Sequence, residues 1–311
     1  MKITIILCMI SISVYASRSW AQQESAWALS TNPVSISYVP KDSAMEAGLR
    51  YLLHQAALPA SDQPDQTQTY RAYVSGNRKL GLLWLAGGID WSQSLLEGRK
   101  WNLLSQPDYL ITAGDSLGEP QRIEKYRIYG QAAYVLSPKI KVGIDGDSTS
   151  NEDRSSYHIY HGMAHLIRIS GGIVYEQVRR RFGASIHYTH RTEELTYDTD
   201  SKDKLYTFPL GYWLPMQELS GSFLFRSQGK RLGVSLQAET LKEHWSLFHD
   251  LSYETQQLAD NPNNSGNLRG WEERLHQISY QSHFTRTNKS WTHIWSPTAR
   301  FNQTTANRIL Q

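Results

Sequence analysis

The eleven histidines are the residues of this chain with the clearest capacity for chemistry. His158, His161 and His165 have the i, i+3, i+7 spacing that would place three imidazoles on one face of a helix, where they could bind a transition metal. On a strand, His158 points away from the other two, and no such site forms. The chain has no His-Glu-x-x-His run, and its single cysteine, Cys8, lies near the N-terminus. We therefore expect no metal and no cofactor.

A serine hydrolase is the second chemistry that the residue types allow. Ser185, His187 and Ser235 fall on the polar faces of expected strands, and a hydrolase needs a serine, a histidine and an orienting polar group in contact. No Gly-x-Ser-x-Gly motif marks a nucleophile. The basic run Arg179-Arg180-Arg181 could bind phosphate, but it lies in an expected turn. The sequence favours a protein that is not an enzyme, with a lipid hydrolase as an alternative.

The elements that would position these side chains are strands. From Glu124 to Asp147 the residues alternate between two faces, and Ser137-Pro138 interrupts the alternation once. Two alternating runs joined by so short a break predict a β-hairpin. The pattern recurs along the chain in roughly a dozen segments of about 9 to 13 residues, the length that a tilted strand needs to cross a bilayer.

Connections between the expected strands alternate between short and long. Short turns are expected at Gly76, Ser137, Arg179, Gln228 and Asn288, and long loops near Asn102, Asn151, Asp200 and Asn264. A membrane barrel sorts its connections in this way, whereas a β-sandwich has no reason to sort loop lengths by end. We predict an all-β fold, an antiparallel up-and-down transmembrane β-barrel of roughly 12 strands over residues 44–301. A secreted β-sandwich that binds a partner is the alternative.

Charge indicates which face of each strand meets lipid, because a Lys or Arg that faces lipid near the midplane costs about 2–4 kcal/mol. The faces that contain Tyr126 and Leu232 carry no charge over several positions, so we expect them to face lipid. The polar side chains expected to face the interior are Lys125, Arg127, Gln131, Lys139, Lys141, Asp145, Arg181, His187, Arg231 and Glu239.

The first 21 residues have the parts of a secretory signal peptide. Lys2 supplies the positive charge, Ile3 to Tyr15 is a mostly apolar core, and Ser19-Trp20-Ala21 offers small residues at the cleavage positions. We predict cleavage before Gln22, which would remove Cys8 and leave a chain without a disulfide. Residues 22–43 have no clear period and are expected to be a periplasmic entry segment; residues 302–311 are expected to be a tail.

Composition limits the partners and the location. A formal net charge of +3 is too small to argue for nucleic acid. No segment after the signal reaches 18 consecutive apolar residues, yet the chain contains 18 Tyr and 10 Trp. Low mean hydropathy with many aromatics is typical of a membrane barrel, because only alternate residues face lipid. We expect a protein of the outer membrane of a Gram-negative bacterium, in contact with outer-membrane lipid and with other envelope proteins as candidate partners. It would act as a pore or as an accessory component of an uptake or export system.

With the strands placed, the chain resembles an uncharacterised family of outer-membrane β-barrels from Bacteroidota, a domain of unknown function. The resemblance rests on the segments Asn32-Pro33 to Tyr51, Glu124-Lys125-Tyr126-Arg127 and Arg181-Phe182-Gly183-Ala184-Ser185. It implies a barrel and a location, and no activity. Such barrels usually finish on a strand with a terminal aromatic residue, but this chain ends ten residues after its last aromatic, Phe301. We therefore expect a shortened or truncated member of the family.

Overall fold

The structure is a computed structural model that describes most of the chain. The described residues are 3–17, 27, 30–39, 42–55, 64–98, 111–114, 120–155, 159–198, 205–209, 217–219, 223–263, 271–288 and 291–308. Nearly all of them are in β-strands, and the one described helical segment is the 3-10 helix η2 (Pro33–Tyr38). No helix in the described ranges is both long enough and apolar enough to cross a membrane.

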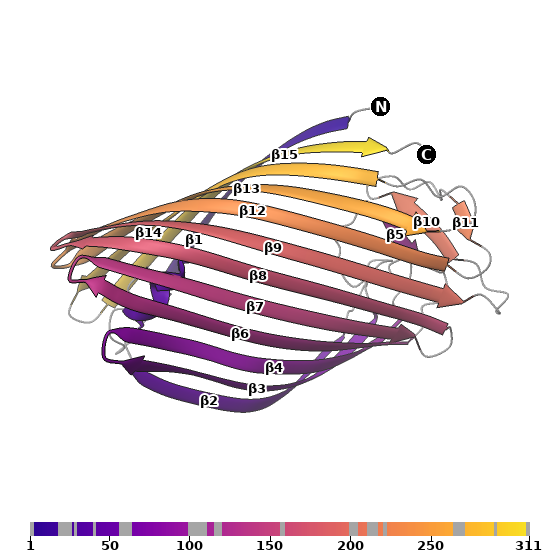
Figure 1. Ribbon diagram of the computed structural model, residues 1–311, viewed down its shortest axis with the longest axis horizontal. Helices are drawn as coiled ribbons and strands as arrows, with labels where there is room; N and C mark the ends of the chain where they lie inside the picture. The colour runs from indigo at the N-terminus through magenta and orange to yellow at the C-terminus, as the bar shows by residue number, and fades with distance from the viewer. Residues whose placement is uncertain are drawn as a thin grey trace.

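Twelve long strands form one antiparallel sheet (Figure 1). In chain order they are β1 (Ile3–Ser17), β2 (Ser43–Gln55), β3 (Gln66–Leu80), β4 (Leu83–Glu97), β6 (Gln121–Ser137), β7 (Ile140–Ser155), β8 (Ile159–Gln177), β9 (Arg180–Asp198), β12 (Phe223–Lys242), β13 (Trp245–Asn263), β14 (Trp271–Asn288) and β15 (Trp291–Arg308). Each long strand from β2 to β14 pairs with the long strand that follows it in the chain, and β1 pairs with β15. Among the described residues, β1 and β2 are edges that are not paired with each other.

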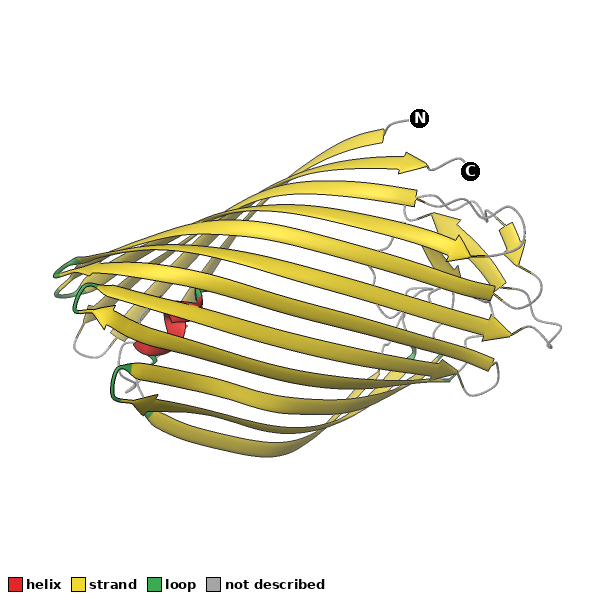
Figure 2. Cartoon of the chain, viewed as in Figure 1, coloured by secondary structure: helices red, strands yellow, loops and turns green. Residues whose placement is uncertain are grey.

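The connections between these strands are sorted by end, as the sequence predicts. Five pairs are joined by two residues each: β3 to β4, β6 to β7, β8 to β9, β12 to β13 and β14 to β15. In the first of these turns Gly81 has a φ of +62°, which a glycine adopts without strain. Figure 2 shows the tight turns at one end of the sheet and the longer connections at the other. We call these the short-turn end and the long-loop end.

Two of the expected turns are wrong, because the chain continues as a strand through them. Gly76 lies within β3, where it pairs with Met45 and Gly87, and Gln228 lies within β12. Asn151, expected in a loop, lies within β7. The strands have 13 to 20 residues, more than a bilayer requires. The ends of the strands therefore extend beyond the lipid, and there polar residues can occupy consecutive positions on both faces. In sequence, such stretches look like turns.

Other expectations are met or extended. The segment from Tyr157 to Ile169, for which helix and strand were both considered, lies largely in strand β8, as predicted. The C-terminal strand β15 continues to Arg308, through most of the expected tail. Leu205–Pro209 is a strand, β10, but it belongs to a separate three-stranded sheet with β5 (Ile111–Gly114) and β11 (Gln217–Leu219) at the long-loop end. Residues 3–17 form β1 in this structure, and the signal peptide stays a prediction.

The two faces of the large sheet differ in polarity. Alternate residues of neighbouring strands, such as Ile128, Ile144 and Leu236, expose 60 to 67% of their surface on one face, which we call the outer face. The opposite, inner face curves around η2 (Figure 2), and it carries the charged side chains Lys141, Glu176, Arg181 and Glu239. An apolar outer face, a polar inner face and hairpins in sequence order define an antiparallel, up-and-down transmembrane β-barrel whose sheet is open between β1 and β2.

Candidate functional site

The most distinctive feature of the interior is a segment of the chain that lies inside the sheet at the short-turn end (Figure 1). It consists of Trp27 and residues 30–39, and we call it the plug. Its helix η2 begins at an Asn-Pro pair, in which the Asn32 side chain accepts a hydrogen bond of 3.0 Å from the Val34 N–H and Pro33 occupies the first turn. Both features are favoured at a helix start, because they leave fewer N–H groups without a partner. The plug contacts β4, β6, β7 and β8.

Asn32 joins the plug to the wall of the barrel. Its Nδ2 donates to the Gln237 Oε1 at 3.1 Å, to the Ala184 carbonyl at 3.2 Å and to the Ile173 carbonyl at 3.4 Å. The side chain is fully buried, so these bonds replace water that cannot reach it. A second polar contact comes from Gln131, whose Nε2 donates to the Pro33 carbonyl at 2.7 Å and to the Ser35 Oγ at 3.0 Å.

Trp27 supplies the apolar part of the contact. It is fully buried and packs with Val34 of the plug and with Val174 and Phe248 of the wall. Its ring meets Phe248 edge-on with 5.4 Å between centroids, and it lies 5.6 Å from the ring of Tyr38. Aromatic pairs at this separation contribute beyond their burial. This is the buried hydrophobic cluster among the described residues, and it lies inside the barrel.

Three wall glycines make room for the plug. A Cβ on Gly183 would overlap the Trp27 ring, and a Cβ on Gly172 would overlap the Asn32 side chain. On β7, a Cβ on Gly143 would lie 2.8 Å from the backbone of Pro33 and Val34. Gly143 and Gly172 are register partners on neighbouring strands. The strip of glycines lets the backbone of the plug approach the backbone of the wall.

A ring of charged side chains surrounds Tyr38 at the end of η2, and we call it the collar. Its members are Lys141, Glu176, Arg181 and Glu239. The Lys141 Nζ lies 4.2 Å and the Arg181 guanidinium 4.7 Å from the Tyr38 ring centre. Arg181 pairs with Glu239 at 2.8 Å and with Glu176 at 3.2 Å, and Lys141 pairs with Glu176 at 3.2 Å. Burial, together with the nearby Glu176 carboxylate, raises the pKa of Tyr38.

Beside the plug lies a polar cavity of about 530 Å³, lined by Thr31 of the plug and by the inner face of the wall. Five basic side chains line it: Lys125, Arg127, Arg168, Arg231 and Arg300. Three acidic side chains line it as well: Asp147, Asp250 and Glu254. Of these, Arg127 forms an ion pair with Asp147, and Arg231 lies 3.7 Å from Glu254. The lining has two more basic than acidic groups, so it suits a small anion or a polar solute with an anionic group.

The side chains expected to face the interior lie in several different places. Lys125, Arg127, His187 and Arg231 line the polar cavity. Gln131 binds the plug directly, and Lys141, Arg181 and Glu239 belong to the collar. Asp145 accepts a hydrogen bond from Ser170 and lies 3.6 Å from Arg168. Lys139 is an exposed residue of the turn between β6 and β7 and lines neither the cavity nor the plug contact.

The residues considered for catalysis do not form a catalytic arrangement. The Ser185 Oγ accepts a hydrogen bond from Gln237 at 3.5 Å, and the His187 Nε2 faces Glu254 at 3.1 Å. Within the described part of the chain no hydrogen bond joins His187 to Ser185 or Ser235. His161 and His165 share the outer face of β8, and His158 lies outside the described residues. No group of three or more His, Cys, Asp or Glu in the described ranges could hold a metal.

The plug is the part of the barrel interior that the alternation pattern and the composition of the sequence do not predict. Trp27 and Asn32 lie in a segment with no alternation, so nothing in their pattern assigns them to the interior. One local signal was available, since an asparagine followed by proline is a common helix start. The segment was expected in the periplasm, whereas its described part lies within the barrel.

The solved structures to which the chain is similar include two hydrocarbon transport proteins and the β domain of an autotransporter. The toluene transporter TodX of Pseudomonas putida is 9% identical, with a TM-score of 0.31 over 95% of this chain and 96% of that chain. The monoaromatic hydrocarbon channel CymD is 11% identical, with a TM-score of 0.32 over 100% and 87%. The β domain of the Bordetella autotransporter BrkA is 11% identical, with a TM-score of 0.32 over 84% and 99%. Such low similarity assigns no role to any residue.

No curated protein matches the chain. A family model does match, over residues 33–311, and its first matched residue is the proline that opens η2. Because the match covers most of the sequence, including η2 and the wall around it, the chain belongs to this family of unknown function (DUF6850).

Proposed function

We propose that this protein is a non-enzymatic pore of the Gram-negative outer membrane, closed at its short-turn end by the plug and selective for small polar solutes. The observation that carries the proposal is the position of the plug, inside the barrel and next to a polar cavity of about 530 Å³. Outer-membrane barrels have short periplasmic turns and longer outer loops, so the plug would lie at the periplasmic side. A solute would enter from outside and meet the plug after the cavity.

The chemistry of the cavity supports the choice of solute. Of its lining residues, Leu166 is the one large aliphatic side chain among the described residues, and most of the others are charged, hydroxyl or amide groups. A solute stripped of water there would find replacement hydrogen bonds, whereas an apolar solute would leave these groups without partners. The excess of basic groups favours anions over cations.

The contacts between plug and wall are strong enough to keep the pore closed. They are also few enough for the plug to move out of the barrel. One tryptophan, one buried asparagine and one short helix account for its main contacts with the wall. Burying the tryptophan stabilises the closed state by roughly 3 kcal/mol, the lower end of what its truncation costs in a core. A partner that pulled the plug out of the barrel would open the pore. In that case the protein would act as an accessory component of an uptake system.

The test is conductance with the plug locked and unlocked. In a Cys8→Ser background, Asn32→Cys with Gly172→Cys places two thiols at the contact of plug and wall, because a Cβ on Gly172 would lie 2.9 Å from the Asn32 Cγ. The folded protein is inserted into planar lipid bilayers and recorded before and after reduction. The matched control is the single variant Asn32→Cys.

We expect rare, brief openings for the native chain, none for the oxidised double variant, and recovery of openings after reduction. Trp27→Ala should open the pore for longer, because the plug loses its apolar contact. Heat-dependent gel mobility shows that each variant is folded, since a barrel resists detergent until it is heated. If Trp27→Ala and the reduced variant stay at the baseline while folded, the protein is not a pore.

A further inference from the structure

Two tyrosine rings lie on the inner face of the barrel, on strands β3 and β6 (Figure 1). Tyr129 is two residues from Arg127 on β6, so both side chains are on the face of the strand that lines the polar cavity. Tyr73 of β3 is on the same face of the sheet, because its register partner on β4, Asp90, is also the register partner of Arg127. The interior therefore has aromatic surface beside its polar lining.

Glycines on the neighbouring strands determine how these rings lie. Gly48 is the register partner of Tyr73, and Gly88 is the register partner of Tyr129. A Cβ on Gly48 would lie 2.6 Å from the Tyr73 ring, and a Cβ on Gly88 would lie 2.7 Å from the Tyr129 hydroxyl. Each ring therefore extends sideways along the wall, over a glycine. Both tyrosines stay partly exposed, so they offer apolar surface to a solute in the lumen.

Guanidinium groups flank both rings. The Cζ atoms of Arg50 and Arg71 lie 5.2 and 5.4 Å from the ring centre of Tyr73, and the Cζ of Arg127 lies 4.9 Å from that of Tyr129. At these separations the cations are attracted to the negative faces of the rings. We call the three arginines and the two tyrosines the tyrosine track.

Carboxylates hold two of these arginines and leave some of their donors available. Arg71 binds Asp90 through Nη2 and through Nε, at 2.8 Å, and Arg127 binds Asp147 through Nη2 and through Nε, at 2.7 Å. The Nη1 of neither arginine donates a hydrogen bond within the described residues. Arg50 donates to the hydroxyl of the nearer tyrosine at 3.2 Å and forms no ion pair in the described ranges.

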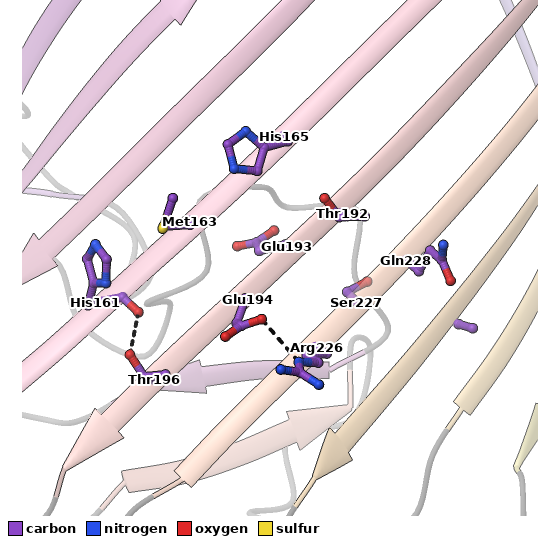
Figure 3. Close-up of a pocket in the computed structure, with 11 residues that line it drawn as sticks. His161, Met163, His165, Thr192, Glu193, Glu194, Thr196, Arg226, Ser227 and Gln228 are labelled. Carbon is purple, nitrogen blue, oxygen red and sulfur yellow. Dashed lines mark hydrogen bonds and ion pairs between the residues drawn. The ribbon is translucent and has the colours of Figure 1, made fainter.

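A larger cavity elsewhere in the barrel lacks this combination. It has about 650 Å³ and lies among β8, β9, β12 and β13, with His161, Glu194 and Arg226 in its lining (Figure 3). Figure 3 shows Glu194 next to Arg226, at 3.1 Å. Among its described lining residues there is no tyrosine, tryptophan or phenylalanine. Its arginine is paired and it has no large ring to pack against a solute, so the tyrosine track is the better candidate for a binding site.

We propose that the tyrosine track binds acidic sugars such as hexuronates, an inference that rests on the proposed function and names its substrate class. The C–H groups of a sugar ring carry a small positive charge, and they pack on the negative face of an aromatic ring. The sugar carboxylate matches the available N–H groups of Arg50, Arg71 and Arg127. Arg127 also lines the polar cavity, so the track and the cavity form one surface.

The carboxylates beside the track favour a sugar over other anions that contain a ring. Asp90 and Asp147 keep 16% and 21% of their side-chain surface exposed, and they can accept hydrogen bonds from hydroxyl groups. An aromatic carboxylate has no hydroxyl donors, so it would remove water from these two side chains without replacing its hydrogen bonds. A sugar acid supplies hydroxyl donors and an anionic group together, and it therefore matches both signs of charge.

The test measures binding to the folded full-length chain in lauryldimethylamine oxide micelles, by titration with saturation-transfer NMR of the ligand protons. The probes are galacturonate, the neutral sugar galactose and the aromatic acid benzoate, all at one ionic strength. Tyr73→Leu with Tyr129→Leu removes both rings of the track. Tyr70→Leu with Tyr126→Leu is the matched control, because these exposed tyrosines are three residues away on the same strands and face outward.

We expect galacturonate to bind about tenfold more tightly than galactose or benzoate, the difference typical of one charge-assisted contact. The inner double variant should lose about tenfold in affinity for galacturonate, and the outer double variant should keep the native affinity. Arg50→Gln should weaken the binding of galacturonate and leave that of galactose unchanged, a split that a merely structural role would not produce.

Absence of galacturonate binding, equal affinities for galacturonate and galactose, equally tight binding of benzoate, or equal losses in the two double variants would each overturn the proposal. The heat-dependent mobility shift confirms that each variant is folded. Binding is measured without a current. A chain that binds galacturonate and never conducts would therefore contradict the pore alone, and one that conducts without binding galacturonate would contradict the acidic-sugar site alone.

Discussion

Two charged regions on the inner face of the barrel have similar residue types but differ in charge balance and in exposure to water. The collar around Tyr38 has two bases and two carboxylates, and Glu239 has no exposed side-chain surface. The cavity beside the plug has five bases and three carboxylates, and Arg127 and Arg231 each keep more than 40% of their side chains exposed. Both regions are formed by the same strands, β7, β8, β9 and β12 among them.

The difference follows from the access of water. Charges removed from water are tolerated when each meets an opposite charge with good geometry, and the collar meets this condition. An excess of one sign is tolerated where water remains, as in the cavity. Balanced charge therefore accompanies the contact that holds the plug, and unbalanced charge accompanies the cavity through which the proposed solute would pass.

The largest effect expected is from breaking the collar. Arg181→Met leaves the buried Glu239 without its cation and leaves the half-buried Glu176 with Lys141 alone, so we expect the free energy of unfolding to fall by roughly 3–5 kcal/mol. The matched change in the cavity, Arg127→Met, breaks an exposed pair and should cost less than about 1 kcal/mol. Urea unfolding in detergent measures both. Equal losses would show that the two regions do not differ in the way proposed here.

A smaller effect is expected from filling the glycine strip. Gly172→Ala places a methyl group against Asn32 and should weaken plug docking by about 1–3 kcal/mol. The adjacent Gly171→Ala is the control, because nothing lies within 4 Å of its added Cβ. Maleimide labelling of Ser35→Cys in a Cys8→Ser background reports exposure of the plug. Labelling should be faster in Gly172→Ala and unchanged in Gly171→Ala. Equal labelling rates in the two variants would show that the contact between Gly172 and Asn32 does not stabilise plug docking.

Alkaline pH should act on the collar through Tyr38. Its pKa is raised when the plug is docked, so the docked state holds the proton after the released state has lost it. Docking is therefore unaffected below about pH 10, the ordinary value for tyrosine, and weakens above it by up to about 1.4 kcal/mol per pH unit. The same labelling rate, measured against pH, should rise above this point. Tyr38→Phe should remove that rise, and if it does not, another group is responsible.

The smallest effect on stability is expected from reversing charge in the cavity. Lys125→Glu with Arg300→Glu turns the excess of two bases into an excess of two acids. Because neither residue belongs to the collar or contacts the plug, stability should change by less than about 0.5 kcal/mol per substitution. In the Trp27→Ala background, the reversal potential in a salt gradient should move from anion to cation selectivity. An unchanged reversal potential would place the ion path outside this cavity.

The strands of the barrel wall were predictable from the sequence, and the errors in that prediction have one cause. Strands that carry apolar residues on one face and polar residues on the other alternate visibly, as Tyr126 and Arg127 do in β6. The stretches around Gly76 and Gln228 were assigned to turns because their residues are polar, but strands continue beyond the bilayer, where polarity no longer indicates a turn. The two-residue turns at Ser137 and Arg179 were placed well because apolar alternation resumes on both sides.

The sequence by itself determined that this protein is built from amphipathic strands, which residues share a face, and that connections are short at one end and longer at the other. These are local properties, since each depends on residues close together in the chain. Only the tertiary structure showed that Trp27 and Asn32 lie inside the barrel, because their partners Phe248 and Gln237 are more than 200 residues away. The collar and the polar cavity were likewise hidden, since each joins side chains from several strands whose neighbours are set by pairing and not by order within any one segment.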